Sequence, residues 1–263
     1  GALHGTGRET ARTLGAGGSV SAGFGERVKE TALSLLFPRR CPVCGEIVMP
    51  KGQRICPPCV KKLDFVREPR CMKCGRSIDE EESRYCHSCE TRERHFEKNL
   101  ALLFYDDCMR RCMAAVKYHH KKEYLAPLGR MLALKFSEEL RRFEADCLLP
   151  VPLHHSRRRI RGFNQAEELS RELARETGIP LFTDVLLREK KTVAQKSLGA
   201  DARIRNLAAA FRAKEGCIEE RKIRRVILVD DIYTTGSTLE ACSQVLRAAG
   251  VEKVLCICLC IVA

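Results

Sequence analysis

VILVDDIYTTGST, residues 226–238, joins a run of aliphatic residues to two acids and a loop of small hydroxylated residues. The aliphatic residues 226–229 predict a strand buried on both faces, which is typical of a parallel sheet. Asp230 and Asp231 follow directly, and the ligands of such sheets bind beyond the carboxyl ends of the strands. The stretch therefore predicts an α/β fold with a ligand site at this strand end.

The loop after the acid pair is suited to holding a phosphate. It leads into a predicted helix that runs to Ala249, and the first amides of a helix favour an anion because they lack partners within the helix. Two carboxylates beside a phosphate would repel it unless they bind neutral hydroxyls or a bridging cation. A ribose 5-phosphate meets both demands, with its diol at the acids and its phosphate at the loop. The loop consists of Thr234, Thr235, Gly236, Ser237 and Thr238, and either Ser237 or Thr238 is expected to cap the helix.

Strands and helices alternate through the rest of the chain after Cys89. The predicted strands are 99–105, 147–152, 226–229 and 254–262, and the helices are 107–117, 123–143, 165–176 and the one ending at Ala249. This alternation predicts an open, mostly parallel sheet with helices on its faces. The last strand, with Cys256, Cys258 and Cys260 alternating with aliphatic residues, should be interior, where free cysteine behaves as a small hydrophobe.

Eight of the sixteen cysteines form an internal duplication. Each copy has the spacing C-x2-C-x11-C-x2-C, and every cysteine of the first copy recurs thirty residues later. A spacing of two residues lets both sulfurs of a cysteine pair face one tetrahedral ion. Gly45 and Gly75 permit the turn that brings backbone amides toward the cysteine thiolates. Four thiolates leave no open position, so we predict structural zinc, held within each copy or across copies. A disulfide-stapled secreted module is disfavoured because no export signal is visible. The ligands are Cys41, Cys44, Cys56, Cys59, Cys71, Cys74, Cys86 and Cys89.

The composition is ordinary, with 44% hydrophobic and 31% charged residues among 263. No run of eighteen apolar residues exists, so we expect no membrane span and a cytoplasmic location. We predict a flexible Gly-rich leader at 1–37, with a transit peptide as the alternative. We further predict a double zinc-ribbon module at 38–95 and a second domain at 96–263.

Positive charge concentrates away from the cysteine module. The formal net charge is +13, and two zinc ions held by eight thiolates would lower it to about +9. Residues 41–100 hold twelve basic and ten acidic side chains, whereas 108–165 hold thirteen against five and 186–225 twelve against five. This distribution favours an anionic ligand, such as a nucleotide or single-stranded DNA, near the predicted site. Aromatic residues are only 6% and Trp is absent, which disfavours a base-stacking platform.

Residues 226–238 resemble the phosphoribosyl pyrophosphate (PRPP) signature of type I phosphoribosyltransferases. With the cysteine knuckles and the segments 116–129, 151–173 and 191–211, the chain resembles the ComF family over about residues 38–263. That family combines a zinc-finger module with a phosphoribosyltransferase-like domain similar to the amidophosphoribosyltransferases. In bacteria it is associated with natural competence, the uptake of DNA.

The resemblance implies roles for particular residues. Asp230 and Asp231 correspond to the catalytic ribose-hydroxyl contacts, and the loop 234–238 corresponds to the 5-phosphate site. It also implies Mg2+ bound with PRPP, and displacement of pyrophosphate from ribose C1 by an acceptor. No residue stands out as a general base for that acceptor. The pyrophosphate loop and the mobile flap would contribute Pro152, Leu153, Lys191, Gln195, Arg203 and Arg205.

Two other functions compete with a phosphoribosyltransferase. One is a non-catalytic component that binds single-stranded DNA, which should survive replacement of both aspartates with Asn. The other is a scaffold whose zinc module docks a helicase-like competence motor, which should bind neither PRPP nor DNA.

Overall fold

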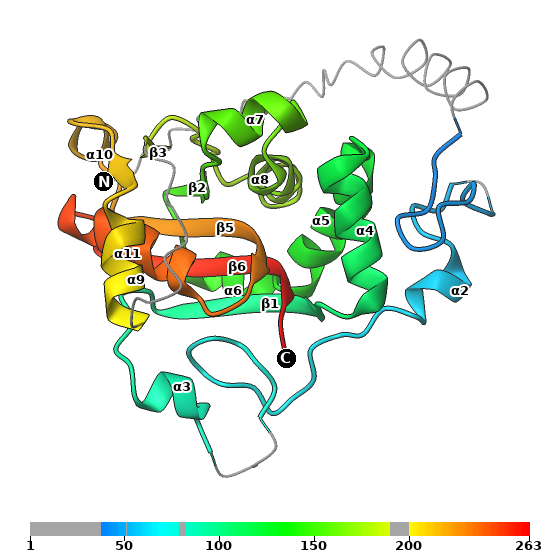
Figure 1. The fold of residues 1–263 in the computed structure, drawn as a ribbon, viewed down its shortest axis with the longest axis horizontal. Helices are drawn as coiled ribbons and strands as arrows, with labels where there is room; N and C mark the ends of the chain where they lie inside the picture. Colours follow the sequence, from blue (N-terminus) through cyan, green and yellow to red (C-terminus); the bar gives the residue numbers. More distant parts are fainter. Residues whose placement is uncertain (1–37, 51, 79–82, 190–199) are drawn as a thin grey trace, which may run out of the picture. The chain divides into compact units, whose positions relative to one another are not determined.

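Four parallel strands form the central sheet, in the order β1-β6-β5-β2 (Figure 1). In this computed structural model, residues 38–50, 52–78, 83–189 and 200–263 are described, and residues 40–263 make up one compact unit. The strands are β1 (Lys98–Phe104), β2 (Cys147–Pro150), β5 (Arg225–Tyr233) and β6 (Lys253–Ile261). The predicted parallel α/β sheet is confirmed, and β6 is an interior strand whose three cysteines are fully buried.

Helices cover both faces of this sheet. Ile227, Val229 and Ile257 belong to one buried cluster, which helices α4, α5 and α8 complete. Val226, Leu228 and other strand residues belong to a second cluster, which α11 completes; α9 packs beside α11. The helices are α4 (Asp107–Tyr118), α5 (Leu125–Lys135), α6 (Ser137–Phe143), α8 (Gln165–Thr177), α9 (Ala200–Ala208) and α11 (Ser237–Ala248). No helix within the described ranges is long and apolar enough to cross a bilayer.

Three boundaries differ from the sequence-based predictions. The helix predicted at 123–143 is divided into the 3-10 turn η1 (Lys122–Tyr124), α5 and α6, because Phe136 leaves helical geometry at φ −108°. Strand β5 continues four residues past Val229, pairing with β6 as far as Tyr233. Gly236, with φ +75°, is the N-cap of α11, so the predicted capping by Ser237 or Thr238 is wrong.

Some short elements have no counterpart in the predictions. They lack the hydrophobic periodicity from which longer helices and strands are predicted. They are α7 (His155–Arg161), the antiparallel pair β3 (Leu186–Arg188) and β4 (Phe211–Ala213), and α10 (Cys217–Glu220).

The thirty-residue duplication is also a structural repeat. An antiparallel bridge joins residues 40 and 47 in the first ribbon, and residues 70 and 77 in the second. The second cysteine pair of each copy opens a single helical turn, α2 (Pro57–Val60) and α3 (His87–Glu90). Both copies therefore fold in the same way around their cysteines.

The ribbons are joined to the sheet by backbone hydrogen bonds along β1. The segment between the ribbons pairs with the strand: the Val66 amide donates to Leu102 O at 3.0 Å, and the Phe104 amide donates to Asp64 O at 2.8 Å. Buried Asn99 fixes the second ribbon, because its backbone amide donates to Lys73 O at 2.7 Å and its Nδ2 donates to Cys74 O at 2.9 Å. A Cβ on Gly75 would lie only 2.4 Å from Asn99 O, so this close approach requires glycine.

Candidate functional site

Each ribbon brings its own four cysteine sulfurs together. The four Sγ atoms of a copy lie within 4.8 Å of one another, and the Sγ atoms of Cys74 and Cys86 are 3.7 Å apart. Zn–S bonds of about 2.3 Å in a tetrahedron place neighbouring sulfurs about 3.8 Å apart, so the donor sets fit structural zinc. The grouping within copies answers the question left open by the spacing. The two sets are Cys41, Cys44, Cys56 and Cys59, and Cys71, Cys74, Cys86 and Cys89.

In the first knuckle, backbone amides favour the thiolate form of Cys41. Gly45 and Gly75 have φ values of +77° and +75°, and their amides close the turns onto Cys41 O and Cys71 O. Burial raises the pKa of Cys41, but hydrogen bonds from backbone amides, including those of Cys44 and Cys56, outweigh it and lower the pKa to about 7. A thiolate at neutral pH is the form that binds zinc.

Strand β5 carries the acid pair, and α4 supplies a cation to it. Lys117 Nζ lies 2.6 Å from Asp231 Oδ2, and the two side chains are only 19% and 16% exposed. The ion pair holds the Asp231 carboxylate beside the ligand region. Lys117 could not be predicted as a site residue, because the spacing along the chain gives no sign that α4 ends beside β5.

Asp230 is half-buried and carries a perturbed carboxyl group. Burial, followed by the negative charge of Asp231, raises the pKa of Asp230 well above its ordinary value. The Asp231 amide donates to Asp230 Oδ1 at 2.8 Å, which opposes this shift only in part. A carboxyl group held at this cost inside β5, three residues before the strand ends, is typical of a functional site.

The first part of the loop 234–238 is exposed and has backbone amides without a partner in the described part of the chain. Thr234 and Thr235 are exposed, and the amides of Thr234, Thr235 and Gly236 donate no hydrogen bond to the described part of the chain. Thr235 Oγ1 and Ser237 Oγ are 2.8 Å apart, which holds the hydroxyl groups together. A Cβ on Gly236 would lie 2.2 Å from the buried Tyr233 hydroxyl, so only glycine fits at the start of α11. This loop is able to accept an oxyanion.

Two arginines, Arg76 in the second ribbon and Arg94 in the segment that follows it, donate hydrogen bonds to carbonyl groups of this loop. Arg76 Nη2 donates to Thr234 O at 3.3 Å, and Arg94 Nη2 donates to Thr235 O at 3.3 Å. Neither arginine could be predicted as a neighbour of the loop, because both lie about 140 positions or more before it.

The predicted pyrophosphate segment follows β2, next to the acid pair. The Val151 amide donates to Val229 O at 2.8 Å, so Pro152 and Leu153 follow at the level of the acids in the neighbouring strand. Arg188 is also near this region: burial and then the charge of Arg157 lower its pKa, while Asp230 opposes the shift. The end of β2 thus lies beside Asp230, and Arg188 is close enough to interact with that carboxyl group electrostatically.

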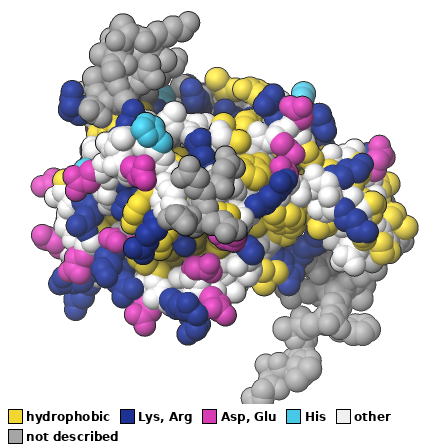
Figure 2. Space-filling model, turned by 90° about the horizontal axis from the view of Figure 1, so that it is seen from below, with side chains coloured by type: hydrophobic (Ala, Val, Ile, Leu, Met, Phe, Trp, Pro, Cys, Tyr) yellow, Lys and Arg dark blue, Asp and Glu magenta, His cyan; other side chains and the backbone are white. Residues whose placement is uncertain are grey.

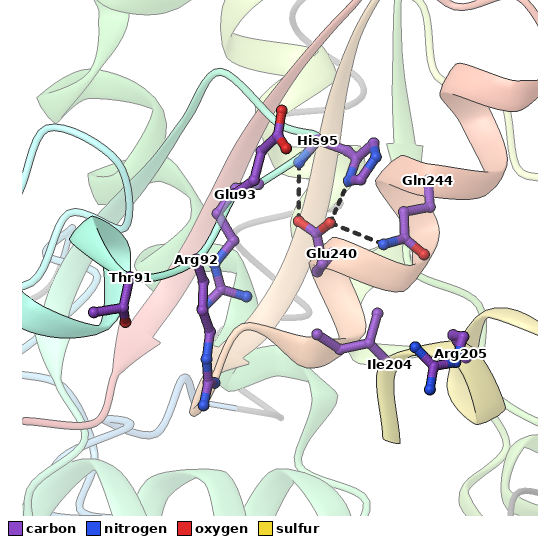
Figure 3. A pocket seen from close by; sticks show the side chains of 9 residues that line it. Thr91, Arg92, Glu93, His95, Ile204, Arg205, Glu240 and Gln244 are labelled. Carbon is purple, nitrogen blue, oxygen red and sulfur yellow. Dashed lines mark hydrogen bonds and ion pairs between the residues drawn. The ribbon is translucent and has the colours of Figure 1, made fainter. Parts of the chain in front are cut away.

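The predicted flap is only partly described. Lys191 and Gln195 lie outside the described residues, as does the side chain of Arg203. Arg205 lines a cavity of about 470 Å³ formed by α9, α11 and the segment leaving the second ribbon (Figure 3). In that cavity, buried Glu240 accepts hydrogen bonds from the His95 amide at 3.0 Å and from Gln244 Nε2 at 3.2 Å, and pairs with His95 Nδ1 at 2.5 Å. The residues lining it do not include Asp230 or Asp231.

Comparisons with known proteins agree with this architecture. The double zinc ribbon domain family matches residues 32–90, and the phosphoribosyl transferase domain family matches residues 160–262. Competence protein F of Haemophilus influenzae is 32% identical over 222 residues, covering 83% of this chain and 95% of the relative. The chain belongs to the ComF family.

Other ComF-family relatives are more distant. DNA utilization protein YhgH of Escherichia coli O157:H7 is 27% identical, over 84% of this chain and 89% of the relative. Competence protein ComFC of Streptococcus pneumoniae is 28% identical, over 76% of this chain and 84% of the relative. The zinc ribbons and the phosphoribosyltransferase-like domain of the ComF family are thus both present in this chain.

Proposed function

We propose that this ComF-family protein binds PRPP, or a related ribose 5-phosphate ester, as part of bacterial DNA uptake. The observation that carries the proposal is the loop 234–238, whose free amides open the helix α11 directly beyond the acid pair. Relatives named competence protein and DNA utilization protein support the link to DNA uptake. Sixteen cysteines without a disulfide fit a reducing compartment, so we further propose the cytoplasm.

Different parts of the site would bind different groups of the ligand. The loop amides and hydroxyls would hold the 5-phosphate, and Asp230 and Asp231 would accept hydrogen bonds from the ribose diol. Mg2+ would bind with the pyrophosphate near Pro152 and Leu153 and neutralise part of its charge. With an acceptor bound, the same arrangement would orient ribose C1 for displacement of pyrophosphate, through positioning and electrostatics rather than covalent catalysis.

Calorimetric titration with PRPP tests the proposal. We expect wild-type protein to bind PRPP with Mg2+ present and to bind at least about tenfold more weakly without it, because the metal offsets the pyrophosphate charge. Asp231→Asn should weaken binding about tenfold or more, since a carboxylate contact to the diol is lost. The matched control is Asp107→Asn, at an exposed aspartate of α4. Absence of binding by the wild-type protein would contradict the proposal.

A second candidate function, binding of single-stranded DNA, is favoured by one surface. Helix α7 carries the exposed Arg157 and Arg159, and Ile160 is 77% exposed between basic neighbours. His120 Nδ1 lies 3.1 Å from Arg161 O, which joins α7 to the end of α4, where Tyr118 is 71% exposed. Basic side chains beside an exposed ring are suited to a DNA backbone and an unstacked base. The face in Figure 2, by contrast, mixes basic and acidic side chains.

Salt-dependent DNA binding tests this second function. Replacing Arg157 and Arg159 with Gln should reduce the slope of log affinity against log salt by about 1.4, because each lost phosphate contact contributes about 0.7 for single strands. Fluorescence anisotropy with a labelled oligonucleotide measures the slope, and Arg212→Gln on strand β4 is the control. An unchanged slope would contradict the DNA-binding surface. Binding of neither PRPP nor DNA would favour the alternative, a scaffold that docks a helicase-like competence motor.

A further inference from the structure

We infer that the second zinc ribbon positions the phosphate loop, with Arg76 and Arg94 as the positioning residues. The inference deepens the proposed function, on which its ligand-binding part rests. Neither arginine needs to touch the ligand, because both act through backbone carbonyls of the loop.

The geometry of the peptide bond connects these contacts to the anion site. In a planar trans peptide, the carbonyl of one residue and the amide of the next point in opposite directions. Arg76 binds the Thr234 carbonyl, so the Thr235 amide points away from the ribbon; Arg94 binds the Thr235 carbonyl, so the Gly236 amide does the same. These two amides donate to no acceptor in the described ranges. The arginines thereby orient two donors for an incoming oxyanion.

The arginines also place positive charge on the side of the loop opposite to the Thr235 and Gly236 amides. Arg94 is 6% exposed and Arg76 is half-buried, and the Nε atom of each is buried without a hydrogen-bond partner in the described part of the chain. Among the described residues, no carboxylate forms an ion pair with either guanidinium. Charges shielded from water act over longer distances than exposed ones, so they favour a dianionic phosphate on the other side of the loop.

The internal duplication provides a comparison within the chain. A shift of thirty residues relates Arg76 to Glu46 and Arg94 to Asp64 of the first ribbon. Both positions therefore carry opposite charges in the two copies. Asp64 pairs with Arg67 at 2.9 Å, and no hydrogen bond between described residues joins it or Glu46 to the loop. The copy that contacts the loop has arginine at both positions, whereas the other copy has an acid at both.

The fold of the second ribbon sets the position of Arg76. Arg76 follows Cys74 by two residues, and its carbonyl accepts a hydrogen bond from the Cys71 amide at 2.7 Å. The metal-binding knuckle therefore fixes the backbone from which Arg76 reaches Thr234. Residues after Cys89 lead to Arg94, beside buried Phe96, which packs with Cys71 and Cys74 in one cluster. Folding around this zinc site thus brings both arginines to the loop.

Hydrogen–deuterium exchange on the full chain without ligand tests the positioning directly. In the double variant Arg76→Gln/Arg94→Gln, the hydrogen-bonded amides of peptides covering residues 230–240, such as the Glu240 amide that donates to Gly236 O at 2.9 Å, should exchange about tenfold faster, because the loop beside them loses two charge-assisted hydrogen bonds. PRPP binding measured by calorimetry should weaken about tenfold or more. Arg76→Lys/Arg94→Lys retains the charge and should recover part of the affinity. Arg84→Gln, at an exposed arginine of the same ribbon, is the control and should change neither measurement.

Each outcome decides the inference. Faster exchange at 230–240 with zinc content unchanged supports it, whereas exchange and affinity equal to wild type would overturn it. If the double variant loses zinc or unfolds, the single variant Arg76→Gln replaces it, because that side chain is only half-buried. Wild-type protein that fails to bind PRPP contradicts the proposed function alone, since the exchange measurement needs no ligand and still tests the positioning.

Discussion

Replacing Cys71 with Ser should leave the chain with one bound zinc ion instead of two and should unfold the second ribbon. Structural zinc contributes about 10–16 kcal/mol to the folding of zinc-finger peptides, so losing one of four thiolates should cost several kcal/mol. Cys71 is fully buried among the other ligands of its set, so a hydroxyl there cannot substitute for the thiolate. Zinc content per chain and thermal unfolding measure the effect.

Two further variants separate metal loss from damage to the core. Cys44→Ser, in the first ribbon, should remove the other zinc ion and leave the second in place, because each set of four sulfurs belongs to one copy. Cys112→Ala, at a buried cysteine of α4 outside both sets, should retain two zinc ions and lose only about 1 kcal/mol through the small cavity. Two zinc ions retained in Cys71→Ser would contradict the assignment of the ligands.

Replacing Asp230 with Asn should make the protein more stable while abolishing PRPP binding. Burial and the charge of Asp231 raise the pKa of Asp230, so its ionised form destabilises the fold at a pH above that pKa. Asn keeps the acceptor for the Asp231 amide without the charge. We therefore expect the variant to unfold at a higher denaturant concentration than wild type at pH 8.

The pH dependence provides the check on this prediction. Because the pKa of Asp230 is raised in the folded state, that state binds more protons than the unfolded state between the ordinary and the raised pKa. Wild-type stability should therefore rise relative to the variant as the pH falls from 8 toward 5, and the difference should shrink. Denaturant unfolding measures it, with Asp107→Asn as the control. A variant that is less stable than wild type at pH 8 would contradict the assigned cause of the pKa shift.

The sheet could be predicted because its signals are local. Strands β1, β5 and β6 are runs of aliphatic residues, and α8 ends at Gly178, which has the left-handed φ expected of a helix C-cap. The duplicated cysteines were equally visible, since a repeat of exact spacing needs no tertiary information. The sequence did not reveal that each zinc site is formed within one copy, because knuckles of identical spacing could also pair across the two copies.

The surroundings of the acid pair were not predictable in the same way. Lys117, Arg76 and Arg94 reach the site from α4 and from the second ribbon, and no pattern along the chain relates them to residues 230–238. The helix break at Phe136 depends on packing, and the extension of β5 to Tyr233 depends on pairing with β6. Both tertiary effects override local propensity. Hydrophobic periodicity predicts helices and strands, but contacts between residues far apart in the sequence determine which side chains form the site.

The pairing of the inter-ribbon segment with β1 has a consequence for the sheet as a whole. An outermost strand with unpaired backbone groups is a template for aggregation. Residues 64–66 cover this side of β1, and on the far side Pro180 and Phe182 pair with Leu148 of β2. A truncated chain beginning at residue 96 would lack residues 64–66 and would therefore expose the outer edge of β1. The cysteine module thus covers the outer edge of β1 in addition to carrying the two metal sites.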